Sequence, residues 1–146
     1  MTGRSLDKVS KAILQIKAAS TKGKLSAMQL DVTDEKSIDQ AVAYVEKEFG
    51  LLDVLINNAA IGNGDPHIKT RFQACMETNV TGPAMVAAAF RPLLFKSQKP
   101  YSIYVSSGVG SLSRSSEPYP NQKPPNPDAY HASKAALNMI AVSRMG

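Results

Sequence analysis

The sequence predicts a doubly wound α/β fold, in which a parallel β-sheet carries helices on both faces. Short apolar segments typical of buried strands alternate along the chain with longer segments whose apolar residues recur at helical spacing. This alternation implies parallel strands joined by right-handed crossovers. Each expected strand ends in small or polar residues, and such sheets bind ligands beyond the carboxyl ends of their strands. With 146 residues, 43% of them hydrophobic, the chain can bury the core of one domain.

The first half of the chain is expected to hold two helices and two strands. Apolar residues at helical spacing predict a helix over residues 5–20, and the segment KLSAMQLDV predicts a buried strand over residues 25–31. A second helix should be capped by Thr33 or Asp34 and closed by Gly50. The strand LLDVLINNAA that follows is too uniformly apolar for a sheet with one solvent-exposed face. We therefore expect it at the centre of the sheet.

The second half predicts a long helix, a strand, a loop and a last helix. Residues 71–96 are mostly helix formers, and Gly82 and Pro83 predict a local irregularity within that helix. The segment YSIYVSS predicts another apolar strand. The segment 108–127 is expected to be an exposed, inserted loop, because its second half contains five prolines. The segment AYHASKAALNMIAVSRM is expected to form the last helix.

Composition argues against several classes of function. The net charge of +5 is scattered among acidic residues rather than gathered in a basic run, so neither nucleic acid nor a membrane is the expected partner. A basic RNA-binding module is an alternative that draws on the charge alone, since aromatic residues are not interleaved on a basic face. The first twenty residues lack the apolar stretch of a signal peptide, and no segment has the length of a membrane span. We therefore expect a cytoplasmic protein.

The single cysteine and the second histidine suggest no further chemistry. Cys75 is the only cysteine, which excludes an internal disulfide and favours a reducing compartment. Because no histidine or acid is placed to activate it, Cys75 is expected to be a small core residue. The neighbours of His131 are not of the types that ligate metals, so we expect a partly exposed helical histidine and no metal site.

A tyrosine and a lysine on the last helix suggest acid/base chemistry. Tyr130 and Lys134 are four residues apart, which places their Cβ atoms about 5–6 Å apart on one helix face. A free tyrosine has a pKa of about 10, and a neighbouring cation favours the phenolate form. Such a phenol could give a proton to a carbonyl oxygen or take one from an alcohol. An ordinary surface pair is the alternative, because many helices contain a tyrosine and a lysine at this spacing.

Five short motifs give this pair a context. In order along the chain they are DVTD at 31–34, NNAA at 57–60, NVTG at 79–82, VSS at 105–107 and YHASK at 130–134. Together they resemble the short-chain dehydrogenase/reductase family, and the long segment after VSS resembles its carbonyl-reductase-like branch. The resemblance implies a Rossmann-type fold and an oxidoreductase that transfers hydride between a nicotinamide cofactor and a small carbonyl or alcohol substrate. The family more commonly has NNAG, with glycine where this chain has Ala60. The alanine adds only a methyl group.

The resemblance also implies a role for each catalytic residue. Tyr130 would be the general acid/base, and Lys134 would favour its phenolate and bind the nicotinamide ribose. Ser107 would orient the substrate carbonyl, with Ser106 as the alternative register. Asn79 would help to hold a water molecule of the proton relay and perturb its helix.

Cofactor binding is implied for a second group of residues. Asp31 would cap the adenine pocket, and Asn57 and Ala59 would line the cofactor. Arg4 resembles the basic residue that pairs with the 2′-phosphate in members that prefer NADP(H), although an ordinary solvated arginine is the alternative. We therefore expect NADP(H) to be favoured over NAD(H).

One part of a dinucleotide-binding domain has no counterpart in the sequence. Such a domain begins with a strand, a glycine-rich turn and a helix, and the two Gly-x-Gly segments here, at 62–64 and 108–110, lack the third glycine. We expect both to be ordinary loop glycines. In register with the family, residues 1–146 form a partial domain that lacks the glycine-rich unit and the C-terminal part. The alternative function is therefore a catalytically inactive fragment that acts at most as an interaction module, for example by homo-oligomerisation through the helices at 71–96 and 128–145.

Overall fold

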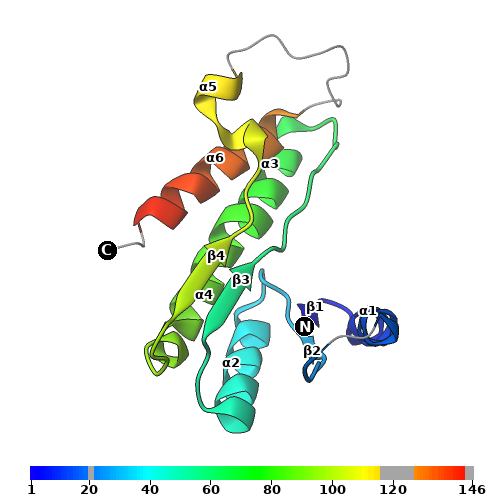
Figure 1. The fold of residues 1–146 in the computed structure, drawn as a ribbon. Coiled ribbons are helices and arrows are strands. Elements are labelled where there is room, and N and C mark those ends of the chain that lie inside the picture. Colours follow the sequence, from blue (N-terminus) through cyan, green and yellow to red (C-terminus); the bar gives the residue numbers. More distant parts are fainter. Residues whose placement is uncertain (20–21, 116–126, 144–146) are drawn as a thin grey trace.

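The structure of the chain is a computed structural model that describes residues 1–19, 22–115 and 127–143 (Figure 1). The first half contains, in order, β1 (Thr2–Gly3), α1 (Leu6–Ala18), β2 (Met28–Gln29), α2 (Glu35–Phe49) and β3 (Val54–Asn57). The second half contains α3 (Ile68–Met76), the π-helical turn η1 (Glu77–Thr81), α4 (Gly82–Leu94), β4 (Tyr101–Tyr104), the 3-10 turn η2 (Gly108–Gly110), α5 (Leu112–Ser115) and α6 (Asp128–Ser143).

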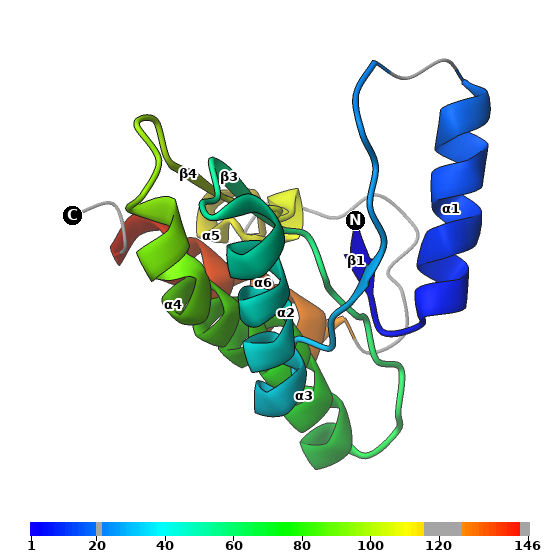
Figure 2. The same ribbon diagram turned by 90° about the horizontal axis from the view of Figure 1, so that it is seen from below.

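Parallel strand pairing confirms the α/β class. β1 pairs with β2, and β3 pairs with β4 in the register Val54 to Tyr101 and Asn57 to Tyr104. Within the described residues the four strands form two separate two-stranded sheets rather than one continuous sheet (Figure 1). Figure 2 shows α2 and α4 beside the β3–β4 pair, whereas α1 lies with β1 and β2 at the other side of the molecule.

The main core lies between two helices and the strands that they cover. Its buried members come from α2 and α4: Ile38, Ala41, Val45, Val86, Phe90 and Leu93. Residues of the strand segments pack against this cluster, among them Met28, Leu30, Leu52 and Leu55. Because each buried aliphatic or aromatic side chain contributes about 1.5–3 kcal/mol, this cluster is the main source of stability that holds α2 against α4.

The helix α2 begins and ends where its sequence signals predict. The Asp34 side chain accepts a hydrogen bond from the Lys36 backbone N–H at 3.1 Å, which makes Asp34 the N-cap. At the other end, Gly50 adopts the left-handed conformation, with φ of 75°, that favours glycine at this position. The choice left open between Thr33 and Asp34 is therefore resolved in favour of Asp34.

The long second-half helix is continuous but irregular, as expected. The irregularity is the π-helical turn η1, which ends at Thr81, immediately before the predicted position at Gly82 and Pro83. A Cβ added at Gly82 would lie 2.8 Å from Val32 Cγ2 and 2.9 Å from the Val32 carbonyl oxygen. A glycine is therefore needed for α4 to start this close to the segment that follows β2.

The predicted place of β3 at the sheet centre is wrong for this structure. β3 pairs only with β4 among the described residues, and Val54 and Ile56 on its outer face are 42% and 59% exposed. On β4, Ile103 is 45% exposed on the same face. The uniformly apolar sequence suits a strand covered on both faces, but no described element covers this one. The face is therefore open.

Two other expectations need correction. The strand expected over residues 25–31 is paired only over β2, because its partner β1 has just two residues. The segment 108–115 is not plain loop but forms η2 and α5. The rest of the expected proline-rich loop, residues 116–126, lies outside the described residues.

Candidate active site

Polar contacts fix α6 beside the carboxyl end of β4. The Lys134 Nζ donates to the Val105 carbonyl oxygen at 2.8 Å, and the Ser106 hydroxyl donates to the Lys134 carbonyl oxygen at 3.5 Å. One turn later, the Asn138 amide donates to the Gly110 carbonyl oxygen at 3.2 Å. The helix that carries the YHASK motif is therefore tied to the segment that carries the VSS motif.

Tyr130 and Lys134 contact each other as their spacing predicts. The Lys134 Nζ lies 5.7 Å from the centroid of the Tyr130 ring, within the range of a cation–π interaction. Lys134 is only 2% exposed, so the pair is not an ordinary surface pair. Burial also lowers the pKa of Lys134, because desolvation disfavours its charged form. The ammonium is thus held between a backbone oxygen and an aromatic ring.

Asn79 connects the end of β3 with α6. Its Oδ1 accepts from the Ile61 backbone N–H at 2.8 Å, and its Nδ2 donates to the Ile61 carbonyl oxygen at 2.8 Å and to the Ser133 hydroxyl at 2.9 Å. The Ser133 hydroxyl in turn donates to the Tyr130 carbonyl oxygen at 2.7 Å. Asn79 is fully buried within the π-helical turn, so both protons of its amide are used structurally.

The two serines of the VSS motif have different environments. The Ser106 hydroxyl is directed to the backbone of α6, as described above. Ser107 precedes η2, and its Oγ accepts a hydrogen bond from the Val109 N–H at 3.5 Å. Ser107 is the acceptor in that contact, so the contact does not use its hydroxyl proton. This difference favours Ser107 over Ser106.

Gly110 has a role that the sequence analysis missed. A Cβ at Gly110 would lie 2.7 Å from the Lys134 carbonyl carbon and 3.0 Å from the Ala135 nitrogen. The backbones of η2 and α6 therefore touch at this point, which brings the Ser107 segment against the turn that carries Lys134. Gly110 was expected to be an ordinary loop glycine, and no local sequence signal marks a contact with a helix 24 residues later.

A pocket lies between the two sheets and runs along β3, from Leu52 before its first residue to Ala59 and Ile61 after its last. Its volume is about 790 Å³, within the usual range of small-molecule and cofactor sites. Four of the five residues expected at the cofactor line it: Arg4, Asp31, Asn57 and Ala59. Lys134 is not among its lining residues, but Ile61, the partner of Asn79, is. The structure thus brings the expected residues together in two adjacent groups.

The polar groups of this pocket could serve a ligand that both donates and accepts hydrogen bonds. Hydrogen bonds from the backbone N–H and the hydroxyl of Thr33 lower the pKa of Asp31, and the nearby Arg4 adds to this effect. The carboxylate is therefore charged and can accept hydrogen bonds from hydroxyl groups. Asn57 is 7% exposed, and its Nδ2 has no hydrogen-bond partner among the described residues. A ligand acceptor would satisfy this buried donor.

Other candidate sites have a structural explanation. Cys75 is fully buried, and its Sγ lies 3.8 Å from the Ile61 carbonyl oxygen, which confirms it as a small core residue. His131 is a half-buried residue of α6. The described part of the chain contains no group of three or more histidine, cysteine, aspartate or glutamate residues that could hold a metal ion. No helix in the described ranges is long and apolar enough to cross a bilayer.

Comparison with known families and sequences gives one consistent result. A family model described as short chain dehydrogenase matches residues 1–144. The short-chain dehydrogenase/reductase tropE of Talaromyces stipitatus is 36% identical over 140 residues, which cover 87% of this chain and 53% of that protein. The short-chain dehydrogenase anuI of Penicillium roqueforti is 36% identical over 149 residues, covering 97% of this chain and 58% of that protein. The chain thus spans about half the length of the curated relatives that it matches.

Solved structures agree with the sequence comparisons. An NADPH-bound carbonyl reductase from chicken fatty liver superimposes with a TM-score of 0.78 at 32% identity, over 95% of this chain and 58% of that one. A metagenomic short-chain oxidoreductase in complex with NADP superimposes with a TM-score of 0.76 at 25% identity, over 97% of this chain and 61% of that one. The arrangement of strands and helices is therefore one that occurs in complete oxidoreductases of this kind.

Proposed function

Because the chain belongs to the short-chain dehydrogenase/reductase family, we propose that it carries the catalytic half of an oxidoreductase that transfers hydride between NADP(H) and a carbonyl or alcohol substrate. The proposed constellation consists of Ser107, Tyr130, Lys134 and Asn79. The observation that carries this proposal is the buried ammonium of Lys134, held 5.7 Å from the Tyr130 ring centroid and bonded to the end of β4. A buried ammonium costs stability unless it is paired and hydrogen-bonded, and Lys134 has one carbonyl partner and no acidic one among the described residues, which favours a functional reason for a lysine here.

Proton transfer is assigned to Tyr130. The bound nicotinamide cofactor would supply or accept the hydride. In the reductive direction Tyr130 gives its proton to the carbonyl oxygen of the substrate, and in the oxidative direction it takes the proton of the alcohol. The Lys134 ammonium stabilises the phenolate that remains after the proton has left.

Ser107 and Asn79 position the reacting groups. The Ser107 hydroxyl donates a hydrogen bond to the substrate oxygen, on which negative charge develops during reduction. The Asn79 side chain fixes Ile61 and, through Ser133, the backbone of Tyr130. Because its two amide protons are engaged, a water molecule of a proton relay would have to bind to another atom of this residue, such as the carbonyl oxygen of its backbone.

The pocket residues are proposed to hold the cofactor. Asp31 would bind hydroxyl or amino groups at the adenosine end, Asn57 and Ala59 would line the cofactor, and Lys134 would reach the nicotinamide ribose. Arg4 is exposed at the end of β1 and would pair with a 2′-phosphate, which favours NADP(H) over NAD(H). Two similar solved structures contain NADPH or NADP, which supports this assignment. The described part of the proposed insertion, residues 108–115, follows Ser107 directly.

Cofactor binding by the chain tests the proposal without requiring turnover. NADPH fluorescence is titrated against the purified chain, and NADH is titrated in parallel. Lys134→Met should weaken the binding of both cofactors, because both carry the nicotinamide ribose. Arg4→Ser should weaken the binding of NADPH alone, because only NADPH carries the 2′-phosphate. If neither substitution changes the binding of either cofactor, these residues do not form the cofactor site.

The open sheet face favours a second candidate for the 146 residues by themselves. Val54, Ile56 and Ile103 are between 42% and 59% exposed on one face of β3 and β4, and apolar faces of this kind mark contact surfaces. The second candidate for the 146 residues by themselves is therefore an interaction module without catalytic activity. The exposed Met139 and Val142 on α6, at 67% and 65%, support homo-oligomerisation through α3–α4 and α6.

A further inference from the structure

We propose that Arg71 and Asp128 form a clamp that positions Tyr130 by holding the first turn of α6 against the segment that follows β3. This role rests on the proposed function, because it matters only if Tyr130 acts at the site described above. Neither residue belongs to the motifs that connect the sequence to its family. Both would be positioning residues, since nothing places them in contact with a substrate or cofactor.

The contact between the two side chains is bidentate. Arg71 Nε donates to Asp128 Oδ1 at 2.9 Å, and Arg71 Nη2 donates to Asp128 Oδ2 at 2.9 Å. Two parallel bonds between guanidinium and carboxylate fix direction as well as distance. The hydrogen bonds from Arg71 lower the pKa of Asp128 to about 2, so the ion pair persists at any physiological pH.

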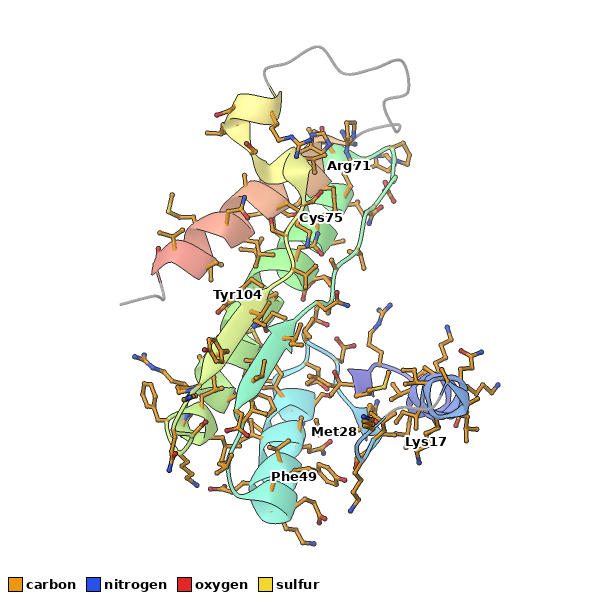
Figure 3. The ribbon with its side chains drawn as sticks, viewed as in Figure 1. Lys17, Met28, Phe49, Arg71, Cys75 and Tyr104 are labelled. Atoms are coloured by element: carbon orange, nitrogen blue, oxygen red, sulfur yellow. The ribbon has the colours of Figure 1, made fainter. Side chains whose placement is uncertain are left out.

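Arg71 also holds the segment between β3 and α3. Its Nη1 donates to the carbonyl oxygens of Asp65 and Pro66, both at 3.2 Å. The guanidinium therefore joins three segments: the first turn of α3, the end of the segment that follows β3, and the first turn of α6. Figure 3 shows Arg71 beside the start of α6, with Cys75 further along α3. The Arg71 side chain is 8% exposed, which limits competition from water.

The position of the clamp links it to Tyr130 rather than to the fold in general. Asp128 is the first residue of α6, and its Oδ1 also accepts from the Ala129 N–H at 2.8 Å, which stabilises the start of the helix. Tyr130 lies in the same turn, whereas Lys134 lies one turn later and is fixed separately by Val105. Helix ends fray more readily than helix interiors. Ser133 and Asn79 hold the carbonyl end of Tyr130, so loss of the clamp should loosen the first turn of α6 and shift the Tyr130 ring relative to a Lys134 that stays bonded to Val105.

The chain offers a second, exposed ion pair as a control for the loss of a charge alone. Lys96 Nζ and Glu46 Oε1 are also 2.9 Å apart, but their side chains are 49% and 58% exposed, and they join α2 to the segment after α4. The variant Lys96→Gln removes an ion pair with the same 2.9 Å distance between nitrogen and oxygen, and neither of its residues belongs to α6. Such an exposed pair contributes little to stability.

The geometry of the Tyr130–Lys134 contact can be measured directly in the free chain. We expect the aromatic ring to shift the NMR signals of the Lys134 ε-methylene protons upfield, because Nζ lies over the ring, 5.7 Å from its centroid. The variant Tyr130→Leu defines the signal without the ring. Asp128→Asn and Arg71→Gln should each lose most of this upfield shift. Arg71→Lys should keep part of it, because a lysine retains the charge but cannot form the two parallel hydrogen bonds. Lys96→Gln should keep all of it.

The outcomes separate this inference from its alternatives. If the Lys134 shift survives in both Asp128→Asn and Arg71→Gln, the clamp does not position Tyr130 and the proposal is wrong. If methyl signals of the α2–α4 core move as much as the Lys134 signal, the ion pair is only a general stabiliser, which also overturns the proposal. Should Arg71→Gln fail to fold, Asp128→Asn decides alone, since its side chain is 43% exposed. A proposed function that fails would instead show in the cofactor titrations, with the Lys134 shift of the unmodified chain intact.

Discussion

Gly110→Ala is the substitution whose effect the structure specifies most closely. The added Cβ would lie 2.7 Å from the Lys134 carbonyl carbon, whereas an ordinary contact begins at 3.4 Å. Both sides of the contact are backbone, so no flexible side chain can give way. The 3-10 turn and α6 would have to separate by about 0.7 Å, the difference between these two distances. Overpacking of this kind costs about 1–3 kcal/mol.

Thermal unfolding followed by circular dichroism measures this cost. For a chain of this size, each kcal/mol lost lowers Tm by about 2–4 °C. The matched control is Gly62→Ala, because a Cβ at Gly62 would have nothing within 4 Å. That control should leave stability unchanged or raise it by about 0.4–1 kcal/mol through the unfolded state. If Gly110→Ala is as stable as Gly62→Ala, the close approach of η2 to α6 is refuted, and with it the placement of Ser107 next to Lys134.

Three further predictions concern the site and its surroundings. Asn79→Ala removes three buried or half-buried hydrogen bonds. At about 1 kcal/mol each, their loss should lower the free energy of unfolding measured in urea by about 3 kcal/mol. An unchanged urea midpoint would contradict the network. The pKa of Asp128 falls from 3.8 to about 2 on folding. The difference in stability between the native chain and Asp128→Asn should therefore be constant above about pH 5 and shrink as the pH falls toward 2. A difference that persists at pH 2 would argue against the ion pair. The purified 146-residue chain should not consume NADPH with a panel of ketones and aldehydes, and cofactor oxidation that disappears in Tyr130→Phe would show that the chain is active alone.

The sequence predicted the elements well where local signals are strong. Asp34 and Gly50 mark the ends of α2 because capping depends on residues within one turn. The irregularity of the long helix was expected at Gly82 and is found in the turn before it, since glycine and proline affect the backbone on both sides. The Tyr130–Lys134 contact follows from helix geometry alone.

The failures concern contacts between segments far apart in the sequence. Pattern alone placed β3 at the centre of a sheet, but its exposure depends on which other elements lie beside it. Gly110 could not be distinguished from a loop glycine, because its neighbour is the backbone of α6. No local signal near Arg71 indicates a contact with Asp128, 57 residues later, and only the fold shows it.

A titration of Lys134 tests most directly whether its ammonium is buried against Tyr130. The carbon-13 signal of the Lys134 ε-methylene group is followed as a function of pH in the native chain, with Lys134→Met to assign it. We expect the pKa of Lys134 to lie below its usual value of 10.5, because the ammonium is desolvated, and the ε-methylene protons to show the upfield shift of a nearby ring. A lysine that titrates at 10.5, with methylene shifts unchanged in Tyr130→Leu, would contradict the account.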